Sequence, residues 1–72
     1  MRVYVFTDLS SKEEFTDQIG FDEAMLLADT LIKAGDTNVG VHQYARKGFN
    51  YPERWWTLED FLTHFNQSIK QS

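Results

Sequence analysis

The stretch of sequence that decides the fold is residues 39–57, VGVHQYARKGFNYPERWWT. Polar residues alternate with β-branched and aromatic ones in its first half, which predicts a strand over 39–46, and its aromatic second half predicts a strand over 49–56. The Lys-Gly pair between the two strands predicts the turn of a β-hairpin. Thr57 is a favourable N-cap residue, so a helix is expected directly after the hairpin.

The residues on either side of the hairpin predict one more strand and two helices. A strand is expected over 3–7, and residues 10–14, which hold a serine with a glutamate three positions later, indicate a short helical turn before Gly20. The clearest helix lies between Asp22, a good N-cap, and Gly35, a typical helix stop. A last helix begins after the hairpin and has apolar residues at helical spacing, namely Leu58, Phe61, Leu62, Phe65 and Ile69.

This element order, strand-helix-strand-strand-helix, predicts an α+β fold with a small mixed three-stranded sheet and two main helices packed on one face. The whole chain, 1–72, is expected to form one domain. Pro52 cannot donate to a sheet ladder, so strand 49–56 is expected at the edge with strand 39–46 in the centre. A right-handed crossover through the first helix would make strands 3–7 and 39–46 parallel neighbours.

Alternation of side chains along the strands assigns residues to the two faces of the sheet. A turn at 47–48 pairs His42 with Glu53 and Tyr44 with Tyr51, and it places Trp56 in the core and Trp55 outside. The first strand is expected to bury Val3 and Val5. The predicted outer face then carries nine side chains, six of them aromatic: Arg2, Tyr4, Phe6, His42, Tyr44, Arg46, Phe49, Tyr51 and Trp55.

Six exposed rings are more than a soluble monomer usually leaves open, so something is expected to cover this face. A register error of one residue would exchange the two faces, and residues 9–20 could fold over the rings with Leu9, Phe15 and Ile19 beneath them. The remaining candidates are a partner protein, a second copy of the chain and nucleic acid. The predicted binding residues are Tyr4, Phe6, Tyr44, Arg46, Phe49, Tyr51 and Trp55.

Composition narrows the class of protein. The chain has 72 residues, no cysteine and a net charge of −4, and aromatic residues make up 15% of it. The first 41 residues carry −5, residues 42–56 carry +2, and the rest −1. No apolar run reaches the ~20 residues of a membrane span, and no targeting signal opens the chain, so a cytoplasmic location and no membrane partner are expected. Small acidic domains of this kind are common among phage and mobile-element proteins.

The basic segment resembles part of the RNA-recognition motif. That family has an aromatic first strand, as in Val3-Tyr4-Val5, and a third strand that opens basic-Gly-aromatic-x-aromatic, as in residues 47–51 here. The resemblance implies that Tyr4, Phe49 and Tyr51 stack on bases and that the third strand lies between the other two. The chain departs from the family in two ways. It has a proline in that strand, and only two residues follow the last predicted helix. Single-stranded nucleic acid is therefore the alternative partner.

Chemical motifs are sparse. The two histidines, His42 and His64, have no second histidine or cysteine at ligand spacing, so neither a metal nor another cofactor is expected. No nucleophile, base and orienting group can be assembled, which predicts a protein that is not an enzyme. The sequence therefore favours a small accessory or regulatory module whose aromatic sheet face docks a partner protein or a second copy of itself.

Overall fold

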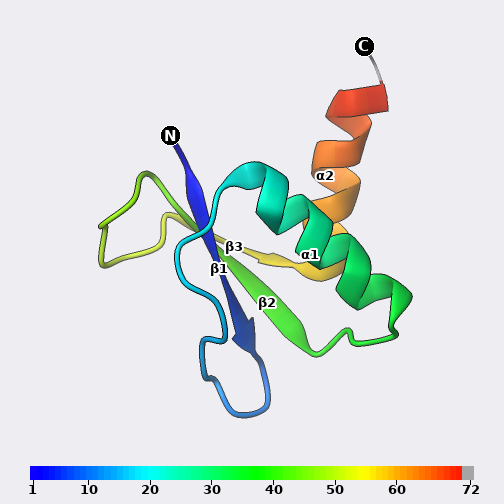
Figure 1. The fold of residues 1–72 in the computed structure, drawn as a ribbon, viewed down its shortest axis with the longest axis horizontal. Helices are drawn as coiled ribbons and strands as arrows, with labels where there is room; N and C mark the ends of the chain where they lie inside the picture. The colour runs from blue at the N-terminus through cyan, green and yellow to red at the C-terminus, as the bar shows by residue number, and fades with distance from the viewer. Residues whose placement is uncertain (71–72) are drawn as a thin grey trace.

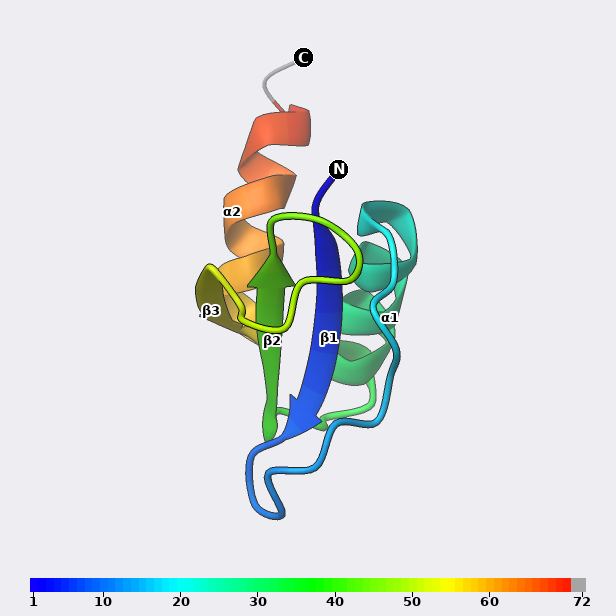
Figure 2. The same ribbon diagram turned by 90° about the vertical axis from the view of Figure 1, so that its left-hand side faces the viewer.

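The computed structural model describes the backbone of residues 1–70 and the side chains of residues 1–65. It contains β1 (Val3–Asp8), α1 (Phe21–Lys33), β2 (Val39–Tyr44), β3 (Arg54–Thr57) and α2 (Leu58–Lys70) (Figure 1). The predicted α+β class and element order are confirmed. Both helices cover the same face of the three-stranded sheet, as expected, and leave the other face to the loops (Figure 2).

The strand order is β1-β2-β3, which confirms β2 in the centre and β3 at an edge. Both neighbouring pairs are antiparallel, so the expected parallel pairing of the first two strands is wrong. The reason lies between β1 and α1, because residues 9–20 carry the chain back to the end of the sheet where β1 begins (Figure 2). α1 then runs in the direction of β1, and β2 has to return against it.

Residues 13–19 pair along the free edge of β1 instead of forming the predicted helical turn near Ser10. The Tyr4 and Ile19 backbones exchange two hydrogen bonds of 2.9 Å, and the Phe15 N–H donates to the Phe6 carbonyl at 3.0 Å. This pairing satisfies backbone groups that a lone edge strand would expose. Within residues 1–70, the outer edge of β3 is the sheet edge without a strand partner.

The core lies between the sheet and the helices, and it contains rings that were expected outside. Tyr4 and Phe6 are 2% and 0% exposed, and the Tyr4 ring meets the Phe61 ring edge-on at 5.2 Å. Phe6 lies level with Val41 on β2, which places both on the helix side of the sheet. The prediction that Val3 and Val5 enter this core is wrong: with Tyr44, they form a separate buried cluster on the opposite face.

The hairpin register differs from the predicted one by two residues. His42 pairs with Trp55 rather than with Glu53, and β3 comprises only residues 54–57. Residues 45–53 form a loop instead of a two-residue turn and the start of a strand. Because a shift of two keeps each side chain on its face, the opposite placement of the two tryptophans is confirmed. Trp56 is 6% exposed, and Trp55 is 47% exposed.

Local signals account for two of the helix ends. Gly35 has φ 79°, and the chain closes α1 there with N–H groups bonded back to Ile32 and Leu31. The Thr57 hydroxyl caps α2 by accepting the Asp60 N–H at 3.1 Å, as predicted. The N-terminus of α1 differs, since its N-cap is Gly20 rather than Asp22. The predicted packing of Ile69 lies outside the residues whose side chains are described.

Candidate functional site

The predicted aromatic face is divided among three environments. Tyr4 and Phe6 are buried against the helices, so their expected place on the outer face is wrong. Tyr44 is on the outer face but only 6% exposed. Burial raises the pKa of both the Tyr4 and the Tyr44 phenol above the ordinary value. Four of the predicted binding residues remain at the surface: Arg46, Phe49, Tyr51 and Trp55.

The chain itself covers much of the outer face, with a segment other than the one expected. The loop of residues 45–53 lies across the sheet over Val5 and Tyr44 (Figure 2). Gln18 holds it there, because its side-chain amide donates to the Phe49 carbonyl at 2.9 Å and accepts the Gly48 N–H at 2.7 Å. Nothing in the local sequence marks Gln18 as an anchor, since its partners lie about thirty residues away.

A hydrogen-bonded cluster fixes the other end of this loop. Glu53 accepts from the Gln43 amide at 2.6 Å and from the Arg2 guanidinium at 2.9 Å. The Gln43 side-chain oxygen in turn accepts the Trp56 indole N–H at 3.2 Å. These donors, Gln43 first and then Arg2, hold the pKa of Glu53 below its ordinary range. The cluster links the N-terminus, β2 and the loop at the start of β3.

This cluster gives the fold a defined response to acid. A carboxyl group whose pKa is lowered on folding stabilises the fold above its unfolded pKa, and the contribution is lost as pH falls through the folded pKa. We therefore expect Glu53→Gln to be less stable than the native chain at neutral pH, with the difference narrowing below about pH 4.5. Urea unfolding at a series of pH values measures this difference. A gap that stays constant with pH would show that the Glu53 charge is not stabilised by folding.

Trp55 marks the part of the outer face that the loop leaves open. Its indole lies over Gly40, so that a Cβ atom at this glycine would stand 2.7 Å from the indole nitrogen and 3.0 Å from a Leu9 methyl group. His42 is its partner on β2. We call Leu9, Gly40, His42 and Trp55 the Trp55 surface. Sequence reasoning identified the tryptophan and missed that a glycine makes room for its ring.

A depression of about 460 Å³ adjoins the Trp55 surface, and its lining includes Leu9 and His42. Thr7 lies in the same lining. Its hydroxyl is buried and has no hydrogen-bond partner among the described residues. A Lys12 ammonium and a Glu14 carboxylate line the same depression. The exposed Trp55 ring therefore lies near a depression whose lining includes one basic and one acidic residue.

The basic residues near the loop are engaged with rings. The Arg46 guanidinium lies 4.7 Å from the centre of the Phe49 ring, and the Arg54 guanidinium lies 3.9 Å from that of Trp56. Arg54 is thus turned toward the helix side of the sheet, away from Trp55.

The arrangement of the strands is not that of the RNA-recognition motif. β1 is adjacent to β2, whereas the family places the hairpin's second strand between the other two. Tyr4 faces the helices, and Phe49 and Tyr51 lie in a loop rather than on a central strand. The three rings that the resemblance assigned to base stacking therefore do not share one face.

Comparison of the chain with protein-family models, curated proteins and solved structures gave no match. In the part of the chain that the structure describes, no group of three or more histidine and carboxylate side chains could hold a metal ion. Neither described helix has the length and apolar composition that a membrane crossing requires. The site therefore has to be interpreted from its own geometry.

Proposed function

We propose that this protein is a non-catalytic binding module of the cytoplasm, and that the Trp55 surface and the open edge of β3 dock a second copy of the chain. The observation that carries the proposal is the position of Trp55. Its ring is 47% exposed on a strand whose outer edge has no partner within residues 1–70. Tryptophan is among the residues that contribute most when an interface buries them.

The charged side chains nearest the edge of β3 make contacts within the chain and do not point toward a second strand. Edge strands commonly avoid unwanted pairing by presenting charged side chains. Here the Arg54 guanidinium stacks on Trp56, and the Glu53 carboxylate is held by Gln43 and Arg2. β3 therefore offers its backbone without a charged side chain aimed outward, and a second β3 could continue the sheet across a two-fold axis.

Size supports self-association over a stand-alone monomer. A chain of 72 residues has a small core and gains a large share of its stability from any further apolar area that it buries. In the proposed dimer each Trp55 ring would lie beside the β3 strand of the partner copy, on the same face of a continuous sheet.

Light scattering across a wide range of concentrations tests the proposal. We expect a dimer that dissociates on dilution, and we expect Trp55→Ala to weaken it by about tenfold or more. Gly40→Ala should weaken it too, because the added methyl group displaces the indole ring. Hydrogen exchange of residues 54–57 should slow as the concentration rises, since pairing across the edge protects these amides.

Tyr51→Ala is the matched control. Tyr51 is 83% exposed on the loop and belongs neither to β3 nor to the Trp55 surface, so its removal should leave the dissociation constant unchanged. A chain that stays monomeric at every concentration would contradict self-association and leave the Trp55 surface to a partner protein. Equal weakening by Tyr51→Ala and Trp55→Ala would place the interface on the loop instead.

Single-stranded nucleic acid is a second candidate, because one loop carries the exposed rings of Phe49 and Tyr51 beside Arg46 and Lys47. Rings that stack on bases and cations that contact phosphates are the usual elements of such sites. Binding of this kind would weaken steeply with added salt, and each removal of a loop charge would flatten that dependence. An interface built on Trp55 responds little to salt, which separates the two functions.

A further inference from the structure

A groove runs along α1 at the opposite edge of the sheet from β3, and none of its lining residues belongs to the Trp55 surface. It consists of two depressions, of about 360 Å³ and 400 Å³, between α1 and residues 13–19. Leu31 lines the first and Leu27 the second, and these residues lie one helical turn apart. Phe15 and Thr16 line the two depressions in the same order. The two depressions are therefore neighbours along the helix, and we refer to them together as the groove.

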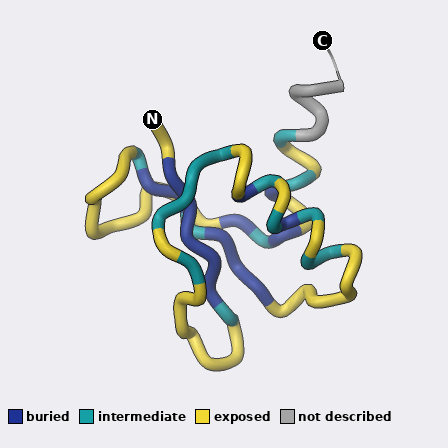
Figure 3. Tube along the Cα trace, in the orientation of Figure 1, coloured by how far each residue is buried: buried dark blue, intermediate teal, exposed yellow. Residues whose placement is uncertain are grey.

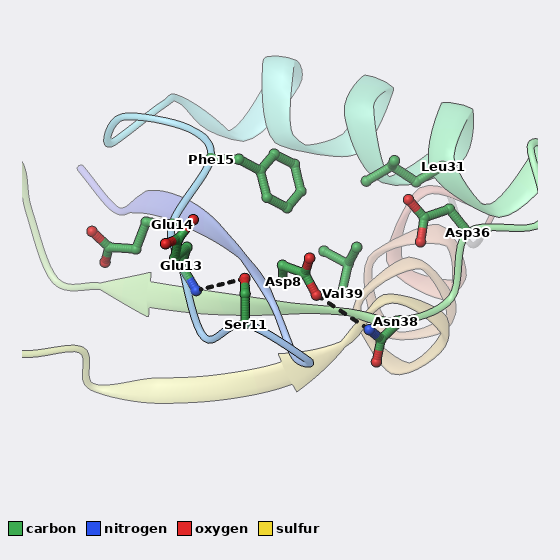
Figure 4. Close-up of a pocket in the computed structure, with 9 residues that line it drawn as sticks. All are labelled: Asp8, Ser11, Glu13, Glu14, Phe15, Leu31, Asp36, Asn38 and Val39. Atoms are coloured by element: carbon green, nitrogen blue, oxygen red, sulfur yellow. Dashed lines mark hydrogen bonds between the residues drawn. The ribbon is translucent and has the colours of Figure 1, made fainter.

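The floor of the groove is apolar and accessible. Phe15 and Leu31 point toward one another across the first depression (Figure 4). Leu26, at the margin of the second, is 70% exposed, and Phe15 is 48% exposed. Only Ala24 and Ala28 of α1 are fully buried, although apolar residues extend over a much wider part of its surface. Leu27 and Leu31 are half-buried and also pack against the core, whereas Leu26 is the α1 leucine that the fold leaves largely exposed.

The rim of the groove is acidic. Asp8, Glu13 and Asp36 line the first depression (Figure 4), and Glu23 lines the second. Glu14 also lines the first depression, and it lines the depression beside the Trp55 surface as well. No lining residue of either depression is basic. The ion pairs found among the described side chains, Arg2 with Glu53 and Lys33 with Asp29, do not involve these five carboxylates. A ligand for this groove has to be apolar along its centre and cationic along its margins.

We propose that the groove binds a basic amphipathic helix of a partner protein. Such a helix presents an apolar stripe flanked by lysine and arginine, and helix-in-groove docking is a recurring mode of peptide recognition. A second copy of this chain cannot supply the occupant, because α1 and α2 both contain more acidic than basic residues. The basic residues 46 and 47 lie in a loop, which Gln18 holds against its own chain.

The test uses a synthetic amphipathic helical peptide of leucine and lysine, with a leucine–glutamate peptide of the same pattern as the charge control. Isothermal titration should show binding of the lysine peptide alone. Amide chemical shifts should move at Phe15, Leu27 and Leu31, which line the groove, and stay constant in β3. We expect the double change Glu13→Gln with Asp36→Asn to weaken binding by about tenfold.

Matched variants separate the groove from the general acidity of the chain. Asp22→Asn with Asp60→Asn removes the same charge from residues that line neither depression, and it should leave the affinity nearly unchanged. Leu26→Gln should weaken binding severalfold, whereas Leu9→Gln, on the Trp55 surface, should have no effect. Both leucines are exposed, so neither change should unfold the protein.

Three results would overturn the proposal. The first is no binding of the lysine peptide. The second is equal weakening by the groove variants and the matched control variants, which would indicate attraction to the net charge alone. The third is competition between the peptide and self-association, which would place a second copy in the groove. A chain that does not dimerise but still binds the lysine peptide would contradict only the function proposed for the Trp55 surface.

Discussion

Trp56→Ala is expected to lower the free energy of unfolding by about 3–5 kcal/mol, the range for removing a large aromatic side chain from a core. Trp56 is 6% exposed, and its ring lies 5.7 Å from the Phe65 ring. Its indole N–H donates to Gln43, which would lose that partner, and the Arg54 guanidinium would lose the ring beneath it. Urea denaturation measures the loss.

Trp55→Ala is the control at the neighbouring position, and it should change the free energy of unfolding by no more than about 1 kcal/mol. The two residues share chemistry and strand, and they differ in the face of the sheet that they occupy. Equal destabilisation by both changes would contradict the register of β2 and β3.

Phe6→Ala should have an effect of the same size, about 3–5 kcal/mol. The Phe6 side chain is fully buried in the layer between the sheet and the helices. This result also tests which face β1 turns to the helices, because the assignment of Val3 and Val5 to the core would place Phe6 on the outer face.

Phe15→Ala is the matched control for this change. Its ring lies 6.3 Å from that of Phe6, but it is 48% exposed on the segment that pairs with β1. We expect a loss of no more than about 1 kcal/mol, also measured by urea denaturation. A small effect of Phe6→Ala, similar to that of the control, would mean that β1 presents its other face to the helices.

The two proposed binding surfaces have different charge, which reflects how charge is distributed along the chain. The groove on α1 is formed by residues 8–39, within the acidic first part of the sequence. The loop beside the Trp55 surface carries Arg46 and Lys47, from the segment with net charge +2. The two regions are neighbours, because Glu14 and Thr16 line the groove and also the depression beside this loop.

Features that depend on neighbouring residues could be predicted from the sequence. The end of α1 at Gly35 and the cap at Thr57 depend on backbone groups within one turn of each residue. The opposite exposure of Trp55 and Trp56 follows from strand alternation, which a register shift of two leaves intact. The last strand does lie at an edge, as predicted, but Pro52 falls in the loop before β3, so its missing N–H does not explain that position.

Contacts between residues far apart in the sequence decided three features. These are the direction of the strands, the face of β1 that is buried, and the segment that lies over the outer face of the sheet. Pairing of residues 13–19 with β1 reversed the chain before α1 began, which made the sheet antiparallel. Packing against the helices, which include Phe61 of α2, is what buries Tyr4 and Phe6. Gln18 then held the loop 45–53 over Val5 and Tyr44. Such contacts form only when the whole chain is compact, because their energy depends on which segments meet and not on the preferences of either segment alone.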